Sequence, residues 1–107
     1  MSELYNLLKD ARKKVAFSWG KGRRYYERPG NSCCAAEAIE NSIEWGPLRN
    51  QAYRLIEKCA GISGMGEYQE GGAQDQTIVG WNDAPERTQV DVLKVYDHAI
   101  AIVKDLR

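Results

Sequence analysis

The stretch WNDAPERTQVDVLKVYDHAIAIVKDLR, residues 81–107, carries the clearest structural pattern in the chain. From Val92 onward, apolar residues recur at helical spacing, which predicts an amphipathic helix that runs to the C-terminus. Thr88 and Asp91 have the spacing of a capping box, with aspartate in place of the usual glutamate. The predicted inward positions of this helix are Val92, Leu93, Tyr96, Ala99, Ile100, Val103 and Leu106.

Upstream of this stretch, the same spacing predicts three more helices. The first covers residues 3–17, with Ser2 as N-cap and an apolar stripe at Leu4, Leu7, Leu8, Ala11 and Val15. The second covers residues 33–45 and is expected to be capped by Asn31 or Ser32. Its small residues, Cys33, Cys34, Ala35 and Ala36, favour close approach to a neighbouring helix.

The third predicted helix begins at Pro47, a residue suited to a first turn, and stops at Gly61. The glycine-rich segment 61–76 is interpreted as a mobile loop. Residues 77–81 have no convincing strand to pair with, which favours a helical or irregular segment. We therefore expect an all-α single domain over residues 1–107, with about four helices, a glycine-rich loop and a basic aromatic loop.

Length and composition limit the class of protein. The chain has 107 residues, 43% of them hydrophobic and 28% charged, which argues against disorder. No apolar run approaches the length of a membrane span, and the first residues do not resemble a signal peptide. We expect a soluble cytoplasmic protein that does not bind membranes.

The three cysteines are an adjacent pair, Cys33 and Cys34, and the separate Cys59. This odd number makes a poor disulfide framework, and a single histidine, His98, makes a poor zinc site. We expect neither metal nor cofactor. Cys34 and Cys59 are interpreted as buried and structural, and a reactive thiol at Cys33 or Cys34 is the alternative.

The first candidate site is the basic aromatic loop. Residues 1–31 carry eight Lys and Arg against three Asp and Glu, and the rest of the chain has the opposite imbalance. Such a basic N-terminal segment can present a patch to an anionic partner. The candidate partner-binding residues are Trp19, Arg23, Arg24, Tyr25, Tyr26 and Arg28. The alternative is structural: Trp19 and one tyrosine anchor the loop while its arginines pair with the acidic half.

The second candidate is the polar corner at residues 81–88. Asn82 and Asp83 favour turns, because their side chains bond nearby backbone N–H groups, and Arg87 could clamp Asp83 or Asp91. These features suffice to make a rigid structural corner. The functional alternative is a polar site of Trp81, Asn82, Asp83 and Arg87 that grips a small polar ligand or a partner peptide.

The corner and the helix after it also carry a family resemblance. Trp81, Asn82, Asp83, Pro85, Arg87 and Thr88, followed by Val92, Leu93, Asp97, Ala99 and Ile100, resemble the C-terminal signature of a small uncharacterised family. Its members occur in bacteriophages and in actinobacteria and other bacteria. The first loop and the small residues at Cys33–Ala36 are loosely similar to that family. The resemblance implies a compact helical domain of unknown function, with a phage-borne origin open, and it transfers no catalytic residue.

The leading functional hypothesis is a non-enzymatic protein-binding module, which in a phage would act on a host protein such as a defence component. A nucleotide- or nucleic-acid-binding protein that uses the basic aromatic loop is the alternative. A small cysteine-dependent enzyme comes third, because no spacing supports a pairing of Cys33 or Cys34 with His98. A homodimer is also open, since the last helix has a wide apolar stripe.

Overall fold

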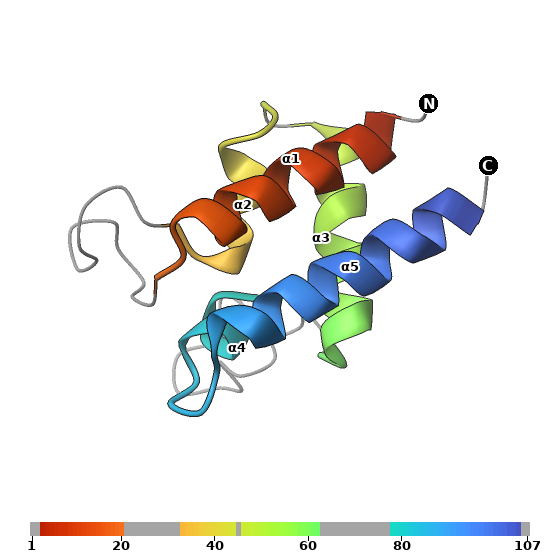
Figure 1. Ribbon diagram of the computed structural model, residues 1–107. Coiled ribbons are helices and arrows are strands. Elements are labelled where there is room, and N and C mark those ends of the chain that lie inside the picture. The colour runs from red at the N-terminus through yellow and green to blue at the C-terminus, as the bar shows by residue number, and fades with distance from the viewer. Residues whose placement is uncertain (1–2, 21–32, 45, 63–77, 106–107) are drawn as a thin grey trace.

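The computed structural model describes residues 3–20, 33–44, 46–62 and 78–105 (Figure 1). In these ranges the chain forms helices and no strand, and an isolated parallel bridge joins Trp19 to Cys33. The helices are α1 (Glu3–Phe17), α2 (Ala35–Glu40), α3 (Pro47–Ala60), α4 (Ile78–Asp83) and α5 (Gln89–Asp105). The all-α fold expected from the sequence is confirmed.

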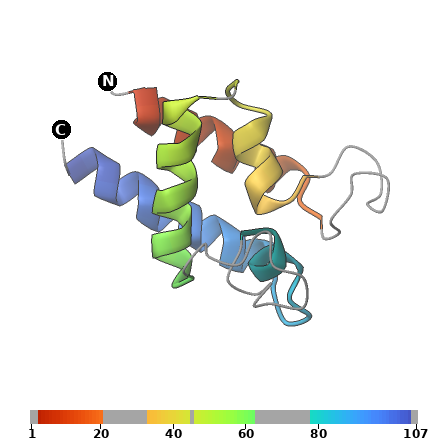
Figure 2. The same ribbon diagram turned by 180° about the vertical axis from the view of Figure 1, so that it is seen from behind.

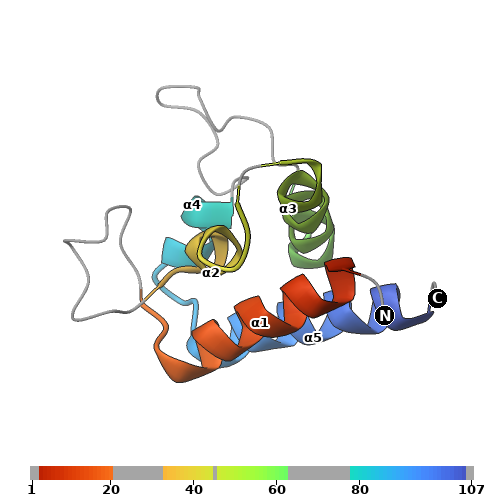
Figure 3. The same ribbon diagram turned by 90° about the horizontal axis from the view of Figure 1, so that it is seen from above.

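The two longest helices form the base of the fold. α1 and α5 lie side by side and antiparallel, so the start of α1 and the end of α5 lie at one end of the pair (Figure 1). The shorter helices α2, α3 and α4 all pack on the same face of this pair (Figure 3). Seen from behind, α3 crosses the pair, while α2 and α4 lie toward its other end (Figure 2).

The predicted bounds of α1, α3 and α5 are close to the observed ones. α3 starts with Pro47 in its first turn and ends at Gly61, whose φ of 74° is the left-handed conformation that favours glycine. At the start of α5, Thr88 N donates to Asp91 Oδ2 (3.0 Å), and Asp91 N donates to Thr88 Oγ1 (3.2 Å). The aspartate version of the capping box is therefore present.

The prediction for α2 was wrong at both ends. The helix starts at Ala35, and its N-cap is Cys34, whose Sγ accepts from Glu37 N at 3.4 Å while Glu37 Oε1 accepts from Cys34 N at 3.3 Å. A thiol is a weak acceptor, so sequence rules do not rank it as a cap. The helix ends at Glu40, where Ser42 Oγ turns back to donate to Ala38 O (2.7 Å).

The helical interpretation of residues 77–81 is confirmed from Ile78 onward, but the turn expected at Asn82 and Asp83 was wrong. Both residues continue α4, and the turn follows it, closed by a bond from Arg87 N to Ala84 O (2.9 Å). The glycine-rich segment predicted at 61–76 lies outside the described residues, apart from Gly61 and Ile62.

The core lies between the α1–α5 pair and the three shorter helices. Its largest fully buried side chains are Tyr96, Leu8, Ile39, Ile56, Val15, Val92 and Asn82. On α5, Leu93 and Ile100 are only partly buried, and Leu106 is outside the described ranges. The small residues of α2, Ala35 and Ala38, are fully buried, as close helix packing requires. Across the four described ranges, no helix is long and apolar enough to span a bilayer.

Candidate functional site

The polar centre of the structure is the side chain of Asn82, which is fully buried. Its Oδ1 accepts hydrogen bonds from Trp19 Nε1 (2.6 Å) and from Ala35 N (3.0 Å). Its Nδ2 donates to Gly20 O (3.1 Å) and to Asp83 Oδ1 (3.0 Å). Both acceptor positions and both N–H donors of the amide are therefore in use. We call this arrangement the Asn82 tie.

The Asn82 tie joins the two stretches that the sequence presents as separate candidate sites. Next to it, Cys33 N donates to Ser18 O (2.8 Å), and Gly20 N donates to Cys33 O (3.1 Å). The indole of Trp19 is thus held at the start of the first loop. This geometry matches the anchoring interpretation of Trp19. The other candidate residues of that loop, Arg23, Arg24, Tyr25, Tyr26 and Arg28, lie outside the described residues.

Tyr96 connects α5 to Ala35, which is also a partner in the Asn82 tie. Its hydroxyl donates to Ala35 O at 2.6 Å, inside the core. Burial raises the pKa of Tyr96 well above its usual value, with smaller contributions from Cys34, Cys33 and Tyr53. Ala35 is therefore held by two side chains from the C-terminal part of the chain, through its N–H and its carbonyl.

Arg87 packs on Trp81 instead of clamping an aspartate as the sequence suggested. Its guanidinium carbon lies 4.1 Å from the centroid of the Trp81 ring, and its Nε donates to Trp81 O at 2.9 Å. The pKa of Asp91 is lowered mainly by the hydrogen bond from the Thr88 backbone, and the charge of Arg87 adds to the effect. Arg87 therefore binds within the corner, on Trp81. A ligand that bound Asn82 would have to replace the buried hydrogen bonds of its amide.

The thiols lie in protected places. Cys33 and Cys34 are 4% and 2% exposed, and the sulfur of Cys34 serves as the cap of α2. Cys59 is partly buried, and burial raises the pKa of its thiol. A raised pKa reduces the thiolate, which is the nucleophilic form. His98 is exposed on α5, and the described residues contain no group of three His, Cys, Asp or Glu placed to hold a metal.

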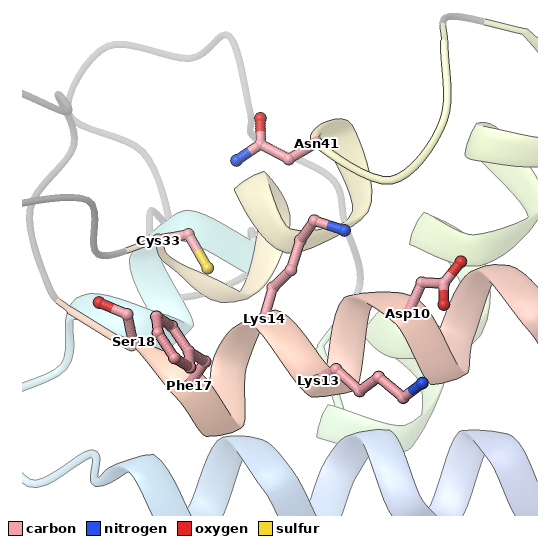
Figure 4. A pocket seen from close by; sticks show the side chains of 7 residues that line it. All are labelled: Asp10, Lys13, Lys14, Phe17, Ser18, Cys33 and Asn41. Atoms are coloured by element: carbon pink, nitrogen blue, oxygen red, sulfur yellow. The ribbon is translucent and has the colours of Figure 1, made fainter.

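An open groove lies between the second half of α1 and the ends of α2, and sequence reasoning did not single it out. Its volume is about 470 Å³, and Figure 4 shows the side chains around it. Phe17, on its rim, is 91% exposed. The lining residues are Asp10, Lys13, Lys14, Phe17, Ser18, Cys33 and Asn41. Phe17 follows Val15 by two positions and so falls off the apolar stripe of α1, which is the signal that could have marked it.

The two groove lysines differ in how they are held. Lys14 Nζ donates to Ser42 Oγ (3.0 Å), so this ammonium group is held between α1 and the turn after α2 (Figure 4). Lys13 is exposed and forms no ion pair with another described residue. Asp10, one turn earlier on α1, adds a single carboxylate. The groove therefore combines an exposed aromatic ring with two cations.

The described residues thus form a helical fold with an internally satisfied polar tie and an open groove lined by α1 and the two ends of α2. The sequence matches the model of a family of unknown function, DUF6197, over residues 2–102. Because the match covers nearly the whole chain, the protein belongs to this family. Comparisons with curated proteins and with solved structures found no match.

Proposed function

We propose that this protein is a non-enzymatic binding module that acts through protein–protein contact at the groove of α1 and α2. The observation that carries the proposal is the exposure of Phe17, which is 91%, beside Lys13 and Lys14. Covering an aromatic side chain that is left in water lowers the free energy of the complex, and aromatic residues are enriched where proteins bind each other. The Asn82 tie holds Trp19 and Gly20, which directly follow Ser18 of the groove lining in the sequence.

A protein partner is favoured over nucleic acid by the charges around Phe17. The groove includes Asp10 among its lining residues, and the whole chain has a net charge of zero. Nucleic-acid surfaces rely on many phosphate contacts, whereas the described residues of the groove offer only two cations, Lys13 and Lys14. Arg23, Arg24, Tyr25, Tyr26 and Arg28, which follow α1 in the sequence, stay candidate partner-binding residues in our proposal.

The choice of partner in our proposal rests on the expectation from the sequence that the family has phage members. In our proposal the protein is phage-borne and acts in the cytoplasm of the host, on a host protein that includes defence components as candidates. The protected positions of Cys33 and Cys34 support a role without catalysis.

The test is capture of partners from host lysate by the tagged full chain, with and without nuclease, followed by mass spectrometry. The variant is Phe17→Ser, and the matched control is Val90→Ser, which changes another exposed apolar side chain outside the groove. Both side chains face water, so the free energy of unfolding of each variant should lie within about 0.5 kcal/mol of that of the parent.

We expect one protein to be captured in stoichiometric amount, to survive nuclease, and to be lost with Phe17→Ser but kept with Val90→Ser. Capture that vanishes with nuclease would replace the proposal with nucleic-acid binding. Equal capture by the parent and by Phe17→Ser would remove the groove from the contact surface.

A further inference from the structure

We infer that the groove binds a short acidic segment of a partner protein, with one apolar side chain against Phe17, a carboxylate at Lys14, and Lys13 as a second cation on the groove lining. This inference rests on the proposed function and specifies the chemistry of the partner. A peptide is the expected ligand, because the groove places an aromatic ring and two cations on one open surface.

The apolar part of the site lies where α1 ends. Phe17 is almost fully exposed, while Cys33 forms a nearly buried part of the groove wall and points its sulfur into it (Figure 4). A ring on the rim and a thiol on the wall contact an apolar side chain without requiring a hydrogen bond. A partner side chain placed here would cover surface that water now contacts.

The charged part of the site is already partly organised. Lys14 is fixed by its bond to Ser42 Oγ (3.0 Å), and that hydroxyl in turn donates to Ala38 O (2.7 Å). An ammonium group has three donors, so Lys14 keeps donors for a carboxylate after its bond to Ser42. Fixing a long side chain before binding reduces the entropy lost when the partner arrives. Lys13, without an ion pair among the described residues, supplies a second cation.

The size and spacing of the groove limit the length of the segment. The volume of about 470 Å³ lies in the lower part of the range that small ligands occupy, so it holds one or two side chains. Lys14 and Phe17 are three positions apart on one helix and therefore share a face. The matching segment places an acidic residue within about one turn, or roughly four residues, of a large apolar residue.

The experiment is selection of random dodecamer peptides displayed on phage against the full chain, followed by binding measurements with the enriched peptides made synthetically. The expected peptides carry Asp or Glu within four residues of Phe, Trp, Leu or Met. Phe17→Ser should weaken their binding at least about tenfold, as loss of an aromatic anchor does. Lys14→Met and Lys13→Glu should each weaken binding severalfold, and added salt should reduce the difference.

The charge control is Lys104→Glu, which makes the same charge change as Lys13→Glu. Lys104 lies in the last turn of α5, and the end of α5 lies beside the start of α1, whereas Phe17 is the last residue of α1 (Figure 1). It should leave peptide binding unchanged. Enrichment of neutral or basic peptides, no enrichment, or equal effects of Lys104→Glu and Lys13→Glu would overturn the inference. Free acetate or benzoate that competes as well as the peptide would overturn it in favour of a small carboxylate ligand. Phe17-dependent capture from lysate would leave the proposed function standing in each of these cases.

Discussion

Trp19 and Asn82 lie 63 positions apart in the sequence, yet the indole Nε1 of Trp19 donates a 2.6 Å hydrogen bond to Oδ1 of Asn82. The same oxygen accepts from Ala35 N, so one buried amide fixes the end of the α1 segment, the start of α2 and α4 together. Asn82 therefore holds Trp19 and Gly20, which lie far from it in the sequence. This relationship explains why the two stretches that look like separate sites in the sequence belong to one structural unit.

Replacing Asn82 by Ala should destabilise the fold strongly. The change removes four hydrogen bonds and leaves the Ala35 N–H and the Gly20 carbonyl without their amide partner. We expect a loss of about 2–4 kcal/mol in the free energy of unfolding, measured by urea denaturation. Asn6→Ala, on the exposed side of α1, is the control and should change the free energy of unfolding by less than about 0.5 kcal/mol. A similar small effect of Asn82→Ala would mean that the tie contributes little to stability.

The capping box of α5 predicts both a mutational effect and a pH effect. Thr88→Ala should lower the free energy of unfolding by about 1 kcal/mol, because Asp91 N then loses its acceptor. The hydrogen bonds from Thr88 lower the pKa of Asp91 in the folded state. This contribution to stability is present above the unfolded pKa of 3.8 and is lost as the pH falls through the lower, folded value.

Urea denaturation between pH 7 and pH 2 measures this contribution when the parent is compared with Asp91→Asn. The difference in free energy of unfolding between the two proteins should shrink as the pH falls below about 4. Glu86→Gln, an exposed change in the preceding turn, serves as the control. A difference that stays constant down to pH 2 would contradict the role of the Asp91 carboxylate.

Tyr96 should make the fold sensitive to alkaline pH. Its pKa is raised from 10.0, chiefly by burial, so the folded state keeps the phenol protonated where the unfolded chain releases the proton. Stability from this group is complete below about pH 10 and falls as the pH rises toward the folded pKa. Tyr96→Phe should lower the free energy of unfolding by about 1 kcal/mol at pH 7, because the hydrogen bond to Ala35 O is removed.

The pH profile separates Tyr96 from the other groups that titrate at high pH. Urea denaturation at several values from pH 8 to pH 11 should give a steeper fall for the parent than for Tyr96→Phe. Parallel profiles would show that Tyr96 ionises equally easily in the folded and unfolded chain.

The thiols should react slowly while the protein is folded. Cys33 and Cys34 are nearly inaccessible, and burial raises the pKa of Cys59. Iodoacetamide at pH 8, read out by mass spectrometry, is therefore expected to label all three residues much faster in urea than in buffer. Rapid labelling of Cys33 or Cys34 in the folded protein would revive the hypothesis of a cysteine-dependent enzyme.

Helical periodicity predicts most of this fold because burial follows local spacing. The stripe that begins at Leu4 identifies α1, and Pro47 with Gly61 marks both ends of α3. The bounds of α2 escaped prediction because its cap is the thiol of Cys34, and because Ser42 turns back on Ala38. Neither contact follows from the usual preferences of these residue types.

The site was harder to predict because its contacts join residues far apart in the sequence. Asn82 follows Ile78 by four positions and so shares its buried helical face, a signal that the turn interpretation concealed. Its partners, Trp19 and Ala35, could not be identified from one sequence without the fold. Phe17 was overlooked because an apolar residue outside the stripe is usually unremarkable by itself.

The groove with Phe17 on its rim is the candidate binding site, because the buried amide of Asn82 serves as a structural tie. A double-mutant cycle of Trp19→Phe and Asn82→Ala, with free energies of unfolding from urea denaturation, tests it most directly. We predict a coupling energy of about 1 kcal/mol between the two changes, because both remove the same buried bond. Strictly additive effects would contradict the tie and return Asn82 to the candidates for ligand binding.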